Sequence, residues 1–250
     1  MSRPPIPRAA VATLAAATIL LLPGTPASAA ADHASGDGVG RQVGTYDYLA
    51  SPDYDGLIPA RAAADGLTLG LGTFDRLDGE LVLVGGDLLR VGVDGVPREV
   101  TDARTTPFFE GVRFQAATSS PVAPGTTCAE LADEVTAVTG TDVGMVAVRV
   151  RGTFTDLVTR SVEPQPEPYP ELARAIAGQT VFPLGQRRAV LVGFWTGPAL
   201  LGVGAPGLHL HGVTANRDAG GHVLSCIVGP DVQLSIQRLS TVDLVSAFRR

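Results

Sequence analysis

LTLGLGTFDRLDGELVLVGGDLLRVGVDGVPREV, residues 67–100, alternates short β-rich runs with turn residues. The runs LTLGLGTF, ELVLV and LLRVGV are separated by DRLDG and GGD, and a DG pair precedes VPREV. Glycine and aspartate at such short intervals favour tight reversals of the chain between strands. The stretch therefore predicts an antiparallel meander.

The rest of the chain extends this strand pattern. EGVRFQA (110–116) predicts one further strand, and the alternating segment 143–162 predicts two. Residues 180–248 are mostly strand-forming again. The predicted fold class is α+β, dominated by antiparallel β-sheet with a few short helices.

Two helices and one long loop interrupt the strands. TTCAELADEVTAVTG predicts a helix, because Thr127 and Glu130 fit a capping box and Gly140 ends the pattern. ELARAIAG (171–178) predicts a second, shorter helix. EPQPEPYP (163–170) predicts an extended loop, since its prolines lack backbone donors, and we expect a seam of the fold near it.

The first 40 residues resemble a targeting segment rather than a folded domain. Two arginines precede the apolar run AAVATLAAATILLLPG, and an Ala-Ser-Ala cleavage pattern follows. We therefore expect a secretory signal peptide over 1–29, a disordered leader over 30–40 and an exported domain over 41–250. A membrane anchor is the alternative, but the apolar run is short and broken by Pro-Gly. No later segment is long and apolar enough to span a bilayer, so we expect no membrane association after the signal is removed.

Composition excludes several functions. The net charge is −6 over 250 residues, which argues against a nucleic-acid partner. The chain contains no lysine, so chemistry that needs a lysine amine, such as a Schiff base, is excluded. Export would permit a disulfide between Cys128 and Cys226. Nothing in the sequence brings the two together, and we expect two separate buried thiols.

Three of the four histidines lie in GLHLHGVTANRDAGGH, residues 207–222. On a strand, His209 and His211 point to the same face. TANRDAGG turns the chain, and a returning strand can bring His222 opposite this pair. Three imidazoles converging in this way predict a facial set of nitrogen ligands suited to Zn²⁺, with open positions for a substrate. The alternative is an ordinary half-buried hairpin with polar side chains.

Together these motifs resemble the acetolactate decarboxylase family. LGTFDRLDGELVLVGGDLLRVGVDG is similar to the family's N-terminal signature, VRVRGTFTDLVTRSVEPQPEPY to its central motif, and GLHLHGVTANRDAGGHVL to its histidine motif. The order and spacing agree, and the similarity runs from Gly44 to about Val232. The resemblance implies two β-rich halves with a metal between them and a carboxy-lyase that converts 2-acetolactate into acetoin and CO₂.

The resemblance also implies roles for individual residues. The zinc ligands fall on His209, His211 and His222, and another divalent ion in place of zinc is the alternative. Among the expected catalytic residues, Glu80 completes the coordination or delivers a proton, and Arg160 holds the substrate carboxylate in a bidentate fork. Thr73 occupies the position of the threonine in the family's G-T-F motif. Without the resemblance, Glu80 would simply follow an Asp-Gly turn and Arg160 would be a solvated cation on an edge strand.

One departure from the family keeps other functions open. Family members continue beyond the histidine motif to a second active-site glutamate, whereas this sequence ends at VSAFRR and has no glutamate after Glu171. A non-catalytic exported metal-binding relative is therefore one alternative, and a hydrolase using the same three histidines is another. We expect a secreted protein with a small-molecule substrate, and a homodimer is compatible with the sequence.

Overall fold

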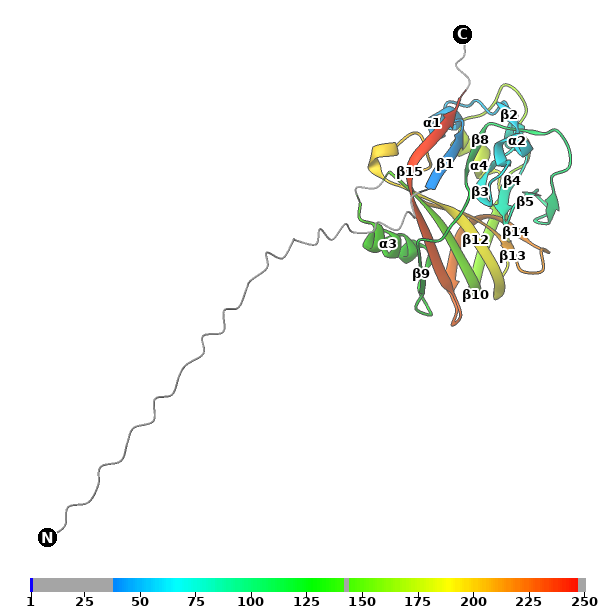
Figure 1. Ribbon diagram of the computed structural model, residues 1–250. Coiled ribbons are helices and arrows are strands. Elements are labelled where there is room, and N and C mark those ends of the chain that lie inside the picture. Colours follow the sequence, from blue (N-terminus) through cyan, green and yellow to red (C-terminus); the bar gives the residue numbers. More distant parts are fainter. Residues whose placement is uncertain (2–37, 142–143, 247–250) are drawn as a thin grey trace. The chain divides into compact units, whose positions relative to one another are not determined.

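The computed structural model describes residues 1, 38–141 and 144–246. Strands dominate this part of the chain, with short helices between them (Figure 1). The strands are β1 (Gly38–Val43), β2 (Ile58–Pro59), β3 (Leu69–Thr73), β4 (Glu80–Val84), β5 (Asp87–Val91), β6 (Pro97–Glu99), β7 (Thr105–Thr106), β8 (Phe108–Val112), β9 (Thr118–Pro121), β10 (Met145–Ser161), β11 (Thr180–Pro183), β12 (Arg187–Thr196), β13 (Gly207–Thr214), β14 (Gly220–Val228) and β15 (Gln233–Val245). The helices are α1 (Tyr46–Ala50), α2 (Ala60–Ala64), α3 (Cys128–Thr139) and α4 (Leu172–Ala177), and 3₁₀ turns occupy Asp75–Leu77 and Pro198–Leu200. Most strand pairs are antiparallel, which confirms the predicted class.

The meander predicted from residues 67–100 is present as β3, β4, β5 and β6. Each of these strands pairs antiparallel with the next. The Asp-Gly turn before β4 depends on Gly79, which has a φ of +86°. A Cβ there would lie 2.6 Å from the carbonyl oxygen of Val91, so the turn has room only for glycine. The meander thus places Glu80 at the first position of a buried strand.

Within the segment 143–162, Met145–Ser161 forms one long strand, β10, and the prediction of two strands was wrong. The pairing of β10 with β12 continues through Gly152, which stands opposite Ala189. The pairing with β12 ends at Phe154, where the pairing with β14 begins, and the register of that second pairing shifts between Phe154 and Asp156. The first part of β10 lies between β12 and β15, and its last residues pair with β14 and β11. Gly152 therefore lies within the ladder and does not end the strand.

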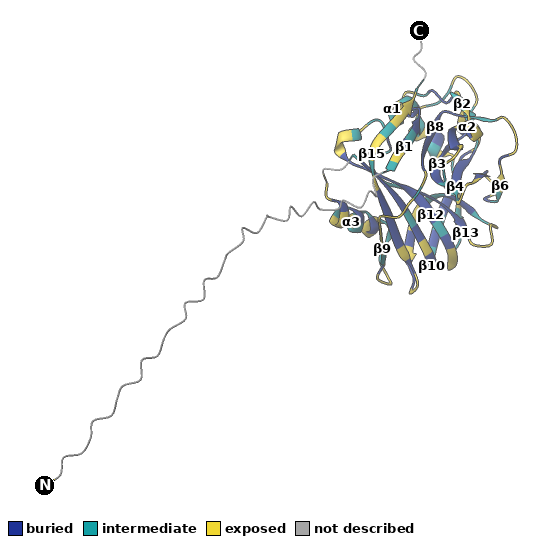
Figure 2. Cartoon of the chain, in the orientation of Figure 1, coloured by how far each residue is buried: buried dark blue, intermediate teal, exposed yellow. Residues whose placement is uncertain are grey.

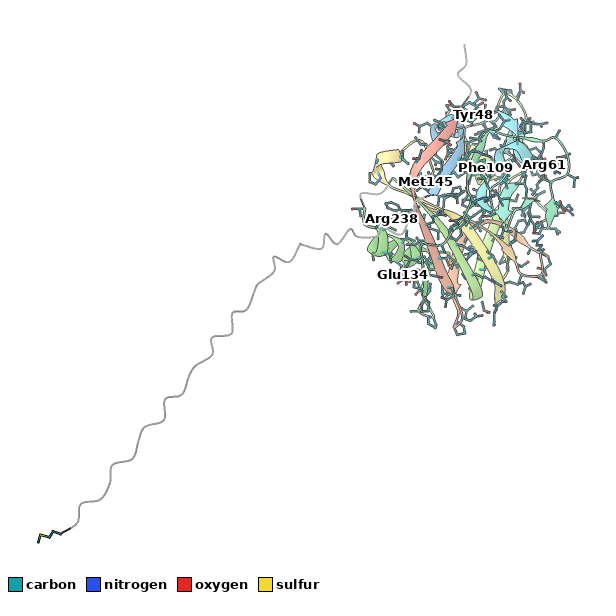
Figure 3. The ribbon with its side chains drawn as sticks, viewed as in Figure 1. Tyr48, Arg61, Phe109, Glu134, Met145 and Arg238 are labelled. Atoms are coloured by element: carbon teal, nitrogen blue, oxygen red, sulfur yellow. A yellow bond between two sulfur atoms is a disulfide. The ribbon has the colours of Figure 1, made fainter. Side chains whose placement is uncertain are left out.

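The predicted helix after residue 126 is confirmed as α3. The Thr127 hydroxyl accepts from the backbone N–H of Glu130, whose carboxylate accepts from Thr127 in return, and Gly140 is the C-cap. At the other end, the Arg238 guanidinium from β15 donates to the carbonyl of Thr139 at 2.6 Å (Figure 3). A cation at this position stabilises the carbonyls that a helix C-terminus leaves unpaired.

Cys128 and Cys226 form a disulfide, so the expectation of two separate thiols was wrong. The two residues are 98 positions apart in the sequence, and their Cα atoms lie 5.1 Å apart. The contact forms because the start of α3 packs on β14, where Thr127 makes an isolated β-bridge with Ile227. Only this tertiary packing brings the sulfur atoms together.

Buried residues follow the strands through the middle of the described domain (Figure 2). One apolar cluster lies between α3 and the strands beside it, and includes Leu131, Val148 and Leu191. A second includes Leu71, Phe108 and Phe194 and adjoins the site described below. Except for β2 and β7, the strands named above belong to one hydrogen-bonded sheet.

The N-terminal expectations fall mostly outside the described residues. Apart from Met1, the predicted signal peptide over 1–29 lies there, and so does the leader as far as residue 37. The predicted leader boundary needs one correction, because residues 38–40 belong to β1 and pair with β15. Among the residues that the structure describes, no helix is long and apolar enough to cross a membrane.

Candidate metal centre and active site

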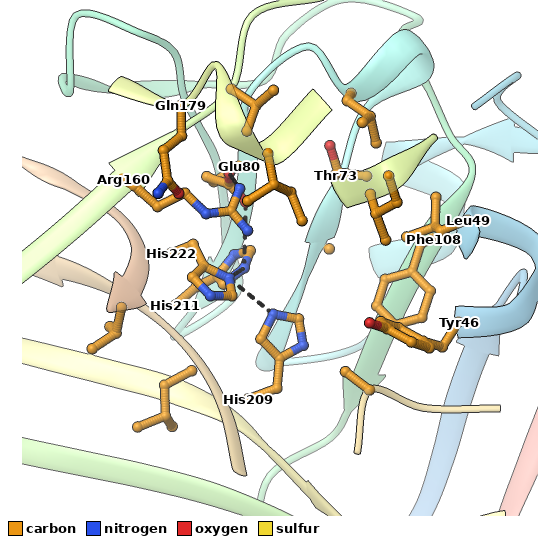
Figure 4. Close-up of a pocket in the computed structure, with 18 of the residues that line it drawn as sticks. Tyr46, Leu49, Thr73, Glu80, Phe108, Arg160, Gln179, His209, His211 and His222 are labelled. Atoms are coloured by element: carbon orange, nitrogen blue, oxygen red, sulfur yellow. Dashed lines mark hydrogen bonds and ion pairs between the residues drawn. The ribbon is translucent and has the colours of Figure 1, made fainter. Parts of the chain in front are cut away.

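A cavity of about 440 Å³ lies where β3 and β4 approach β10, β13 and β14. Its polar wall carries the three histidines of the predicted site together with Glu80 and Arg160 (Figure 4). Its apolar lining includes Tyr46 and Leu49 of α1, Phe108 of β8, and Leu172 and Ile176 of α4. The cavity therefore combines ionisable groups with an apolar surface, as small-molecule sites commonly do.

The β13–β14 hairpin brings the histidines together as the sequence predicts. His209 and His211 occupy alternate positions of β13, and His211 stands directly opposite His222 of β14. Gly221 has a φ of +131°, and a Cβ there would lie 2.4 Å from the carbonyl oxygen of Arg160. The glycine thus lets β14 run close against β10 immediately before His222.

The ring nitrogens converge at distances that suit a metal. His222 Nδ1 lies 3.2 Å from His209 Nε2 and 3.2 Å from His211 Nε2. The three ligand nitrogens all lie within 4.8 Å of one another. Nitrogen ligands at ~2.0–2.1 Å from a tetrahedral Zn²⁺ would be separated by roughly 3.3 Å. Of the residues that the structure describes, these three histidines form a set that can hold a divalent ion.

A backbone hydrogen bond fixes which nitrogen of His211 faces the cluster. His211 Nδ1 lies 2.8 Å from the carbonyl oxygen of Leu81, which can only accept, so Nδ1 carries the proton. Nε2 of the neutral ring then keeps its lone pair and points toward His222. Burial lowers the pKa of His209 to about 3, and it also holds the pKa values of His211 and His222 well below their usual range. Nearby positive charge, including that of Arg160, acts in the same direction. Neutral rings of this kind are the form that ligates metals.

Glu80 and Arg160 meet beside the histidines. Arg160 Nη1 donates to Glu80 Oε1 at 2.6 Å, and Glu80 Oε2 lies 3.4 Å from His211 Nε2. Both side chains are nearly buried, with 11% of Arg160 and 6% of Glu80 exposed. Burial raises the pKa of Glu80, while the positive charge of Arg160 opposes that rise. The Arg160 Nε has no hydrogen-bond partner in the described part of the chain, so the guanidinium keeps a free donor.

Thr73 lines the same cavity but is engaged within its own hairpin. It stands directly opposite Glu80 in the β3–β4 pair, and its hydroxyl donates to the carbonyl of Gly79 at 2.8 Å. The structure thus brings together the predicted histidines, Glu80 and Arg160, while Thr73 supports the turn that leads into Glu80.

The sequence prediction missed two polar residues at the site, the buried Glu110 and the half-buried Gln179. Glu110 lies at the centre of β8, is 1% exposed, and has one carboxylate oxygen 3.9 Å from His209 Nδ1. Neither of its oxygens has a hydrogen-bond partner among the described residues, and burial raises its pKa to about 8. Gln179, which follows α4, lines the cavity near Arg160 (Figure 4), and its buried side-chain carbonyl oxygen has no hydrogen-bond partner among the residues that the structure describes. The one available signal was the charge of Glu110 inside the apolar run FFEGV.

Comparison with known proteins identifies the class to which this fold and site belong. The family model described as alpha-acetolactate decarboxylase matches residues 41–247. The alpha-acetolactate decarboxylase of Methanosarcina mazei is 37% identical over 183 residues, which cover 73% of this chain and 64% of that protein. The enzyme of the same name from Bacillus licheniformis is 31% identical, with 73% and 72% of the two chains covered. The crystal structure of alpha-acetolactate decarboxylase from Bacillus subtilis strain 168 superposes with a TM-score of 0.78 at 28% identity, covering 83% of this chain and 88% of that chain.

These matches span most of the described domain. The chain belongs to the alpha-acetolactate decarboxylase family. The match with the M. mazei protein covers less than two thirds of that protein's length.

Proposed function

We propose that this protein is a carboxy-lyase that converts 2-acetolactate into acetoin and CO₂ and uses Zn²⁺. The observation that carries this proposal is the convergence of three histidine nitrogens beside the buried Glu80–Arg160 pair in a cavity of about 440 Å³. Membership of the decarboxylase family supports the reaction and the substrate.

The donor set fits a catalytic zinc. His209 Nε2, His211 Nε2 and His222 Nδ1 would hold the ion, since three neutral imidazoles with remaining open positions are typical of such sites. When bound, the cation supplies a Lewis acid that stabilises the negative charge left on the substrate. Because the chain has no lysine, an imine cannot take that role.

The protein's own charged residues bind the substrate and move its proton. The guanidinium of Arg160 binds the substrate carboxylate with the donors that Glu80 leaves free. When the bond to the carboxylate breaks, its electron pair stays on the carbon next to the ketone, which gives an enediolate. One proton added to that carbon gives acetoin. Glu80 is placed to take up and deliver that proton, because it lies beside the histidines and burial raises its pKa, while the charge of Arg160 opposes that rise.

The cavity also supports a two-part description of the fold. Glu80 and Thr73 come from the β3–β4 hairpin, whereas Arg160 and the histidines come from β10 and the β13–β14 hairpin. We propose that these are the two β-rich halves and that the site lies between them. The joint presence of Glu80, Arg160 and the histidines in one cavity does not favour a non-catalytic metal-binding role.

We also propose that the protein works outside the cytoplasm. The N-terminal sequence has the layout of a signal peptide. The Cys128–Cys226 disulfide adds independent support, because such bonds persist mainly in oxidising compartments. Sequencing the N-terminus of the protein recovered from the culture medium tests the proposal, with a start near Ala30 as the expected result.

The decisive test of the reaction uses purified full-length protein and racemic 2-acetolactate. Acetoin should accumulate, stop after treatment with a chelator, and return when Zn²⁺ is added back. Absence of chelator-sensitive acetoin would overturn the proposed reaction.

Metal content provides a separate test of the site. The protein should bind one Zn²⁺ per chain, and His222→Ala should lose both the metal and the activity because it removes one of three ligands. His33→Ala is the matched control, since it removes the chain's one other histidine and leaves His209, His211 and His222 in place. Equal zinc contents in the two variants would contradict the assignment of the ligands.

A further inference from the structure

We infer that Glu110 is a positioning residue, which accepts a hydrogen bond from His209 Nδ1–H and so keeps His209 Nε2 free as a ligand. The inference deepens the proposed metal site and depends on that proposal. It concerns a carboxyl group that lies beyond the three ligands and takes no part in holding the ion directly.

The first observation is that Glu110 has no partner of its own. It lies on β8, a strand whose five residues are all buried, and neither carboxylate oxygen makes a hydrogen bond among the described residues. Burying a carboxyl group without a hydrogen-bond partner lowers the stability of the native state, so such a group is expected to have a compensating interaction or a function.

The second observation is that the neighbouring His209 has a buried ring nitrogen that also lacks a hydrogen-bond partner among the described residues. This nitrogen, Nδ1, lies 3.9 Å from Glu110 Oε2. An N–H···O hydrogen bond spans ~2.7–3.2 Å, so a side-chain movement of roughly 1 Å would join the two unpaired atoms.

The third observation is that the corresponding nitrogen of His211, its Nδ1, does have a hydrogen-bond partner. This nitrogen donates to the carbonyl of Leu81, which leaves Nε2 for the cluster. His209 likewise presents Nε2 to the cluster, 3.2 Å from His222, but no backbone carbonyl bonds its Nδ1 in the described structure. Ligating histidines commonly donate their second N–H to a carboxylate or a carbonyl, and this contact fixes the ring and its tautomer. Glu110 is placed to do for His209 what Leu81 does for His211.

The surroundings of Glu110 leave space for this role. A Cβ added to Gly204 would lie 2.6 Å from Glu110 Oε1 and 2.5 Å from Thr196 Oγ1, so the chain passes beside the carboxyl group only because residue 204 has no side chain. Gln42 of β1 stands directly opposite Glu110, and within the described part of the chain its side-chain amide and the Thr196 hydroxyl are also buried without hydrogen-bond partners. These groups are candidates to bind Oε1 while Oε2 faces His209.

The test compares two substitutions that keep the size of the side chain. Glu110→Gln retains an oxygen that can accept from His209, whereas Glu110→Met removes it. Zn²⁺ affinity of the full chain is measured by competition with a chromophoric chelator. We expect Glu110→Met to weaken Zn²⁺ binding by ~10–100-fold and Glu110→Gln to retain most of the affinity. Glu99→Gln, an exposed glutamate on β6, is the control and should bind as the wild type does.

A second readout needs no metal. Nitrogen-15 NMR of zinc-free protein reports the tautomer of His209, which should be protonated on Nδ1 in the wild type. Glu110→Met should shift the ring toward protonation on Nε2, and Glu110→Gln should restore the original state. A purely structural role for Glu110 would leave this tautomer unchanged.

The outcomes separate this inference from the proposed function. Unchanged Zn²⁺ affinity in a folded Glu110→Met variant would overturn the inference, and so would a wild-type His209 protonated on Nε2. The wild-type spectrum decides the point even if the variant does not fold. If no form of the protein binds Zn²⁺, the proposed metal site fails, while the tautomer still tests the contact between Glu110 and His209.

Discussion

Two buried carboxyl groups flank the histidine cluster, and their surroundings differ sharply. Glu80, at the start of β4, accepts from Arg160 at 2.6 Å and lies 3.4 Å from His211. Glu110, at the centre of β8, approaches His209 at 3.9 Å but makes no hydrogen bond within the described structure. Both are almost fully buried, so desolvation acts on both while only one has a countercharge. The same residue type is therefore part of an ion pair on one side of the cluster and unpaired on the other.

The difference predicts opposite effects on stability. Removing the partner of Glu80 leaves a buried charge uncompensated, whereas removing Glu110 relieves a cost that the native state already bears. Groups that violate the rules of polar burial are expected at functional sites. Each prediction below tests this contrast.

The largest effect is expected when the Glu80 pair is broken. Arg160→Met should lower the free energy of unfolding of the metal-free protein by about 3–5 kcal/mol, because Glu80 stays buried without its partner. Acetoin formation should fall by roughly 100-fold or more, since the substrate carboxylate loses its cationic partner. Denaturant unfolding and initial rates measure the two effects.

The matched control removes both charges. Glu80→Gln with Arg160→Met should recover much of the lost stability without recovering activity, because no unpaired charge remains. If the Arg160→Met protein had the same free energy of unfolding as the wild type, the ion pair of Glu80 would not contribute to stability, and the contrast with Glu110 would be contradicted.

A destabilising change away from both carboxyl groups shows whether a loss of stability alone lowers zinc binding and activity. Replacing Cys128 and Cys226 by Ala should cost about 2–5 kcal/mol, because the disulfide restrains a long loop in the unfolded chain. Zn²⁺ affinity and acetoin formation at 25 °C should stay close to wild type. If both fell with stability, losses in the Arg160 variant could no longer be assigned to the site itself.

The buried carboxyl group of Glu110 should make the free energy of unfolding depend on pH. Burial raises the pKa of Glu110 from 4.5 to about 8, so the native state binds a proton over an interval in which the unfolded chain releases it. Stability from this group is therefore lost as pH rises from about 5 to 8. In metal-free protein, Glu110→Gln should gain stability over the wild type across that interval, on the order of 1–3 kcal/mol. Urea unfolding at several pH values measures this gain, and a difference independent of pH, as expected for the control Glu99→Gln, would contradict it.

The smallest effect is expected at the turn that positions Glu80. Thr73→Val keeps the shape of the side chain but removes the hydroxyl that donates to Gly79. We expect a loss of about 1 kcal/mol in unfolding free energy and only a modest fall in the rate of acetoin formation, with Thr73→Ser close to wild type. A rate loss as large as that of Arg160→Met would instead show that the Thr73 hydroxyl acts on the substrate.

The parts of the site that the sequence predicted are those set by local rules. Alternation along one strand places His209 and His211 on the same face, and a short turn sets His222 opposite them. The meander likewise follows from turn residues spaced a few positions apart, and α3 from its capping box. In each case the information lies within about 15 neighbouring residues.

What could not be predicted depends on contacts between distant strands. Glu110 is buried because β8 lies between β1 and β3, which no local pattern reveals. The pairing of Cys128 with Cys226 depends on α3 packing against β14. The continuity of β10 was missed because Gly152 resembles a turn residue, although its neighbours on β12 hold it in the ladder.

The pairing of β1 with β15 has a consequence for how this domain is made. These strands run parallel side by side, with Val43 opposite Val245, although they are the first and last strands that the structure describes. The pairing of β1 therefore cannot be completed until the residues of β15, as far as Val245, have left the ribosome. Joining such distant segments requires a large loss of chain entropy before favourable contacts between them can form. Folds with many such contacts therefore form slowly. The newly made polypeptide should accordingly spend a long interval without a finished core, exposed to proteases and to aggregation.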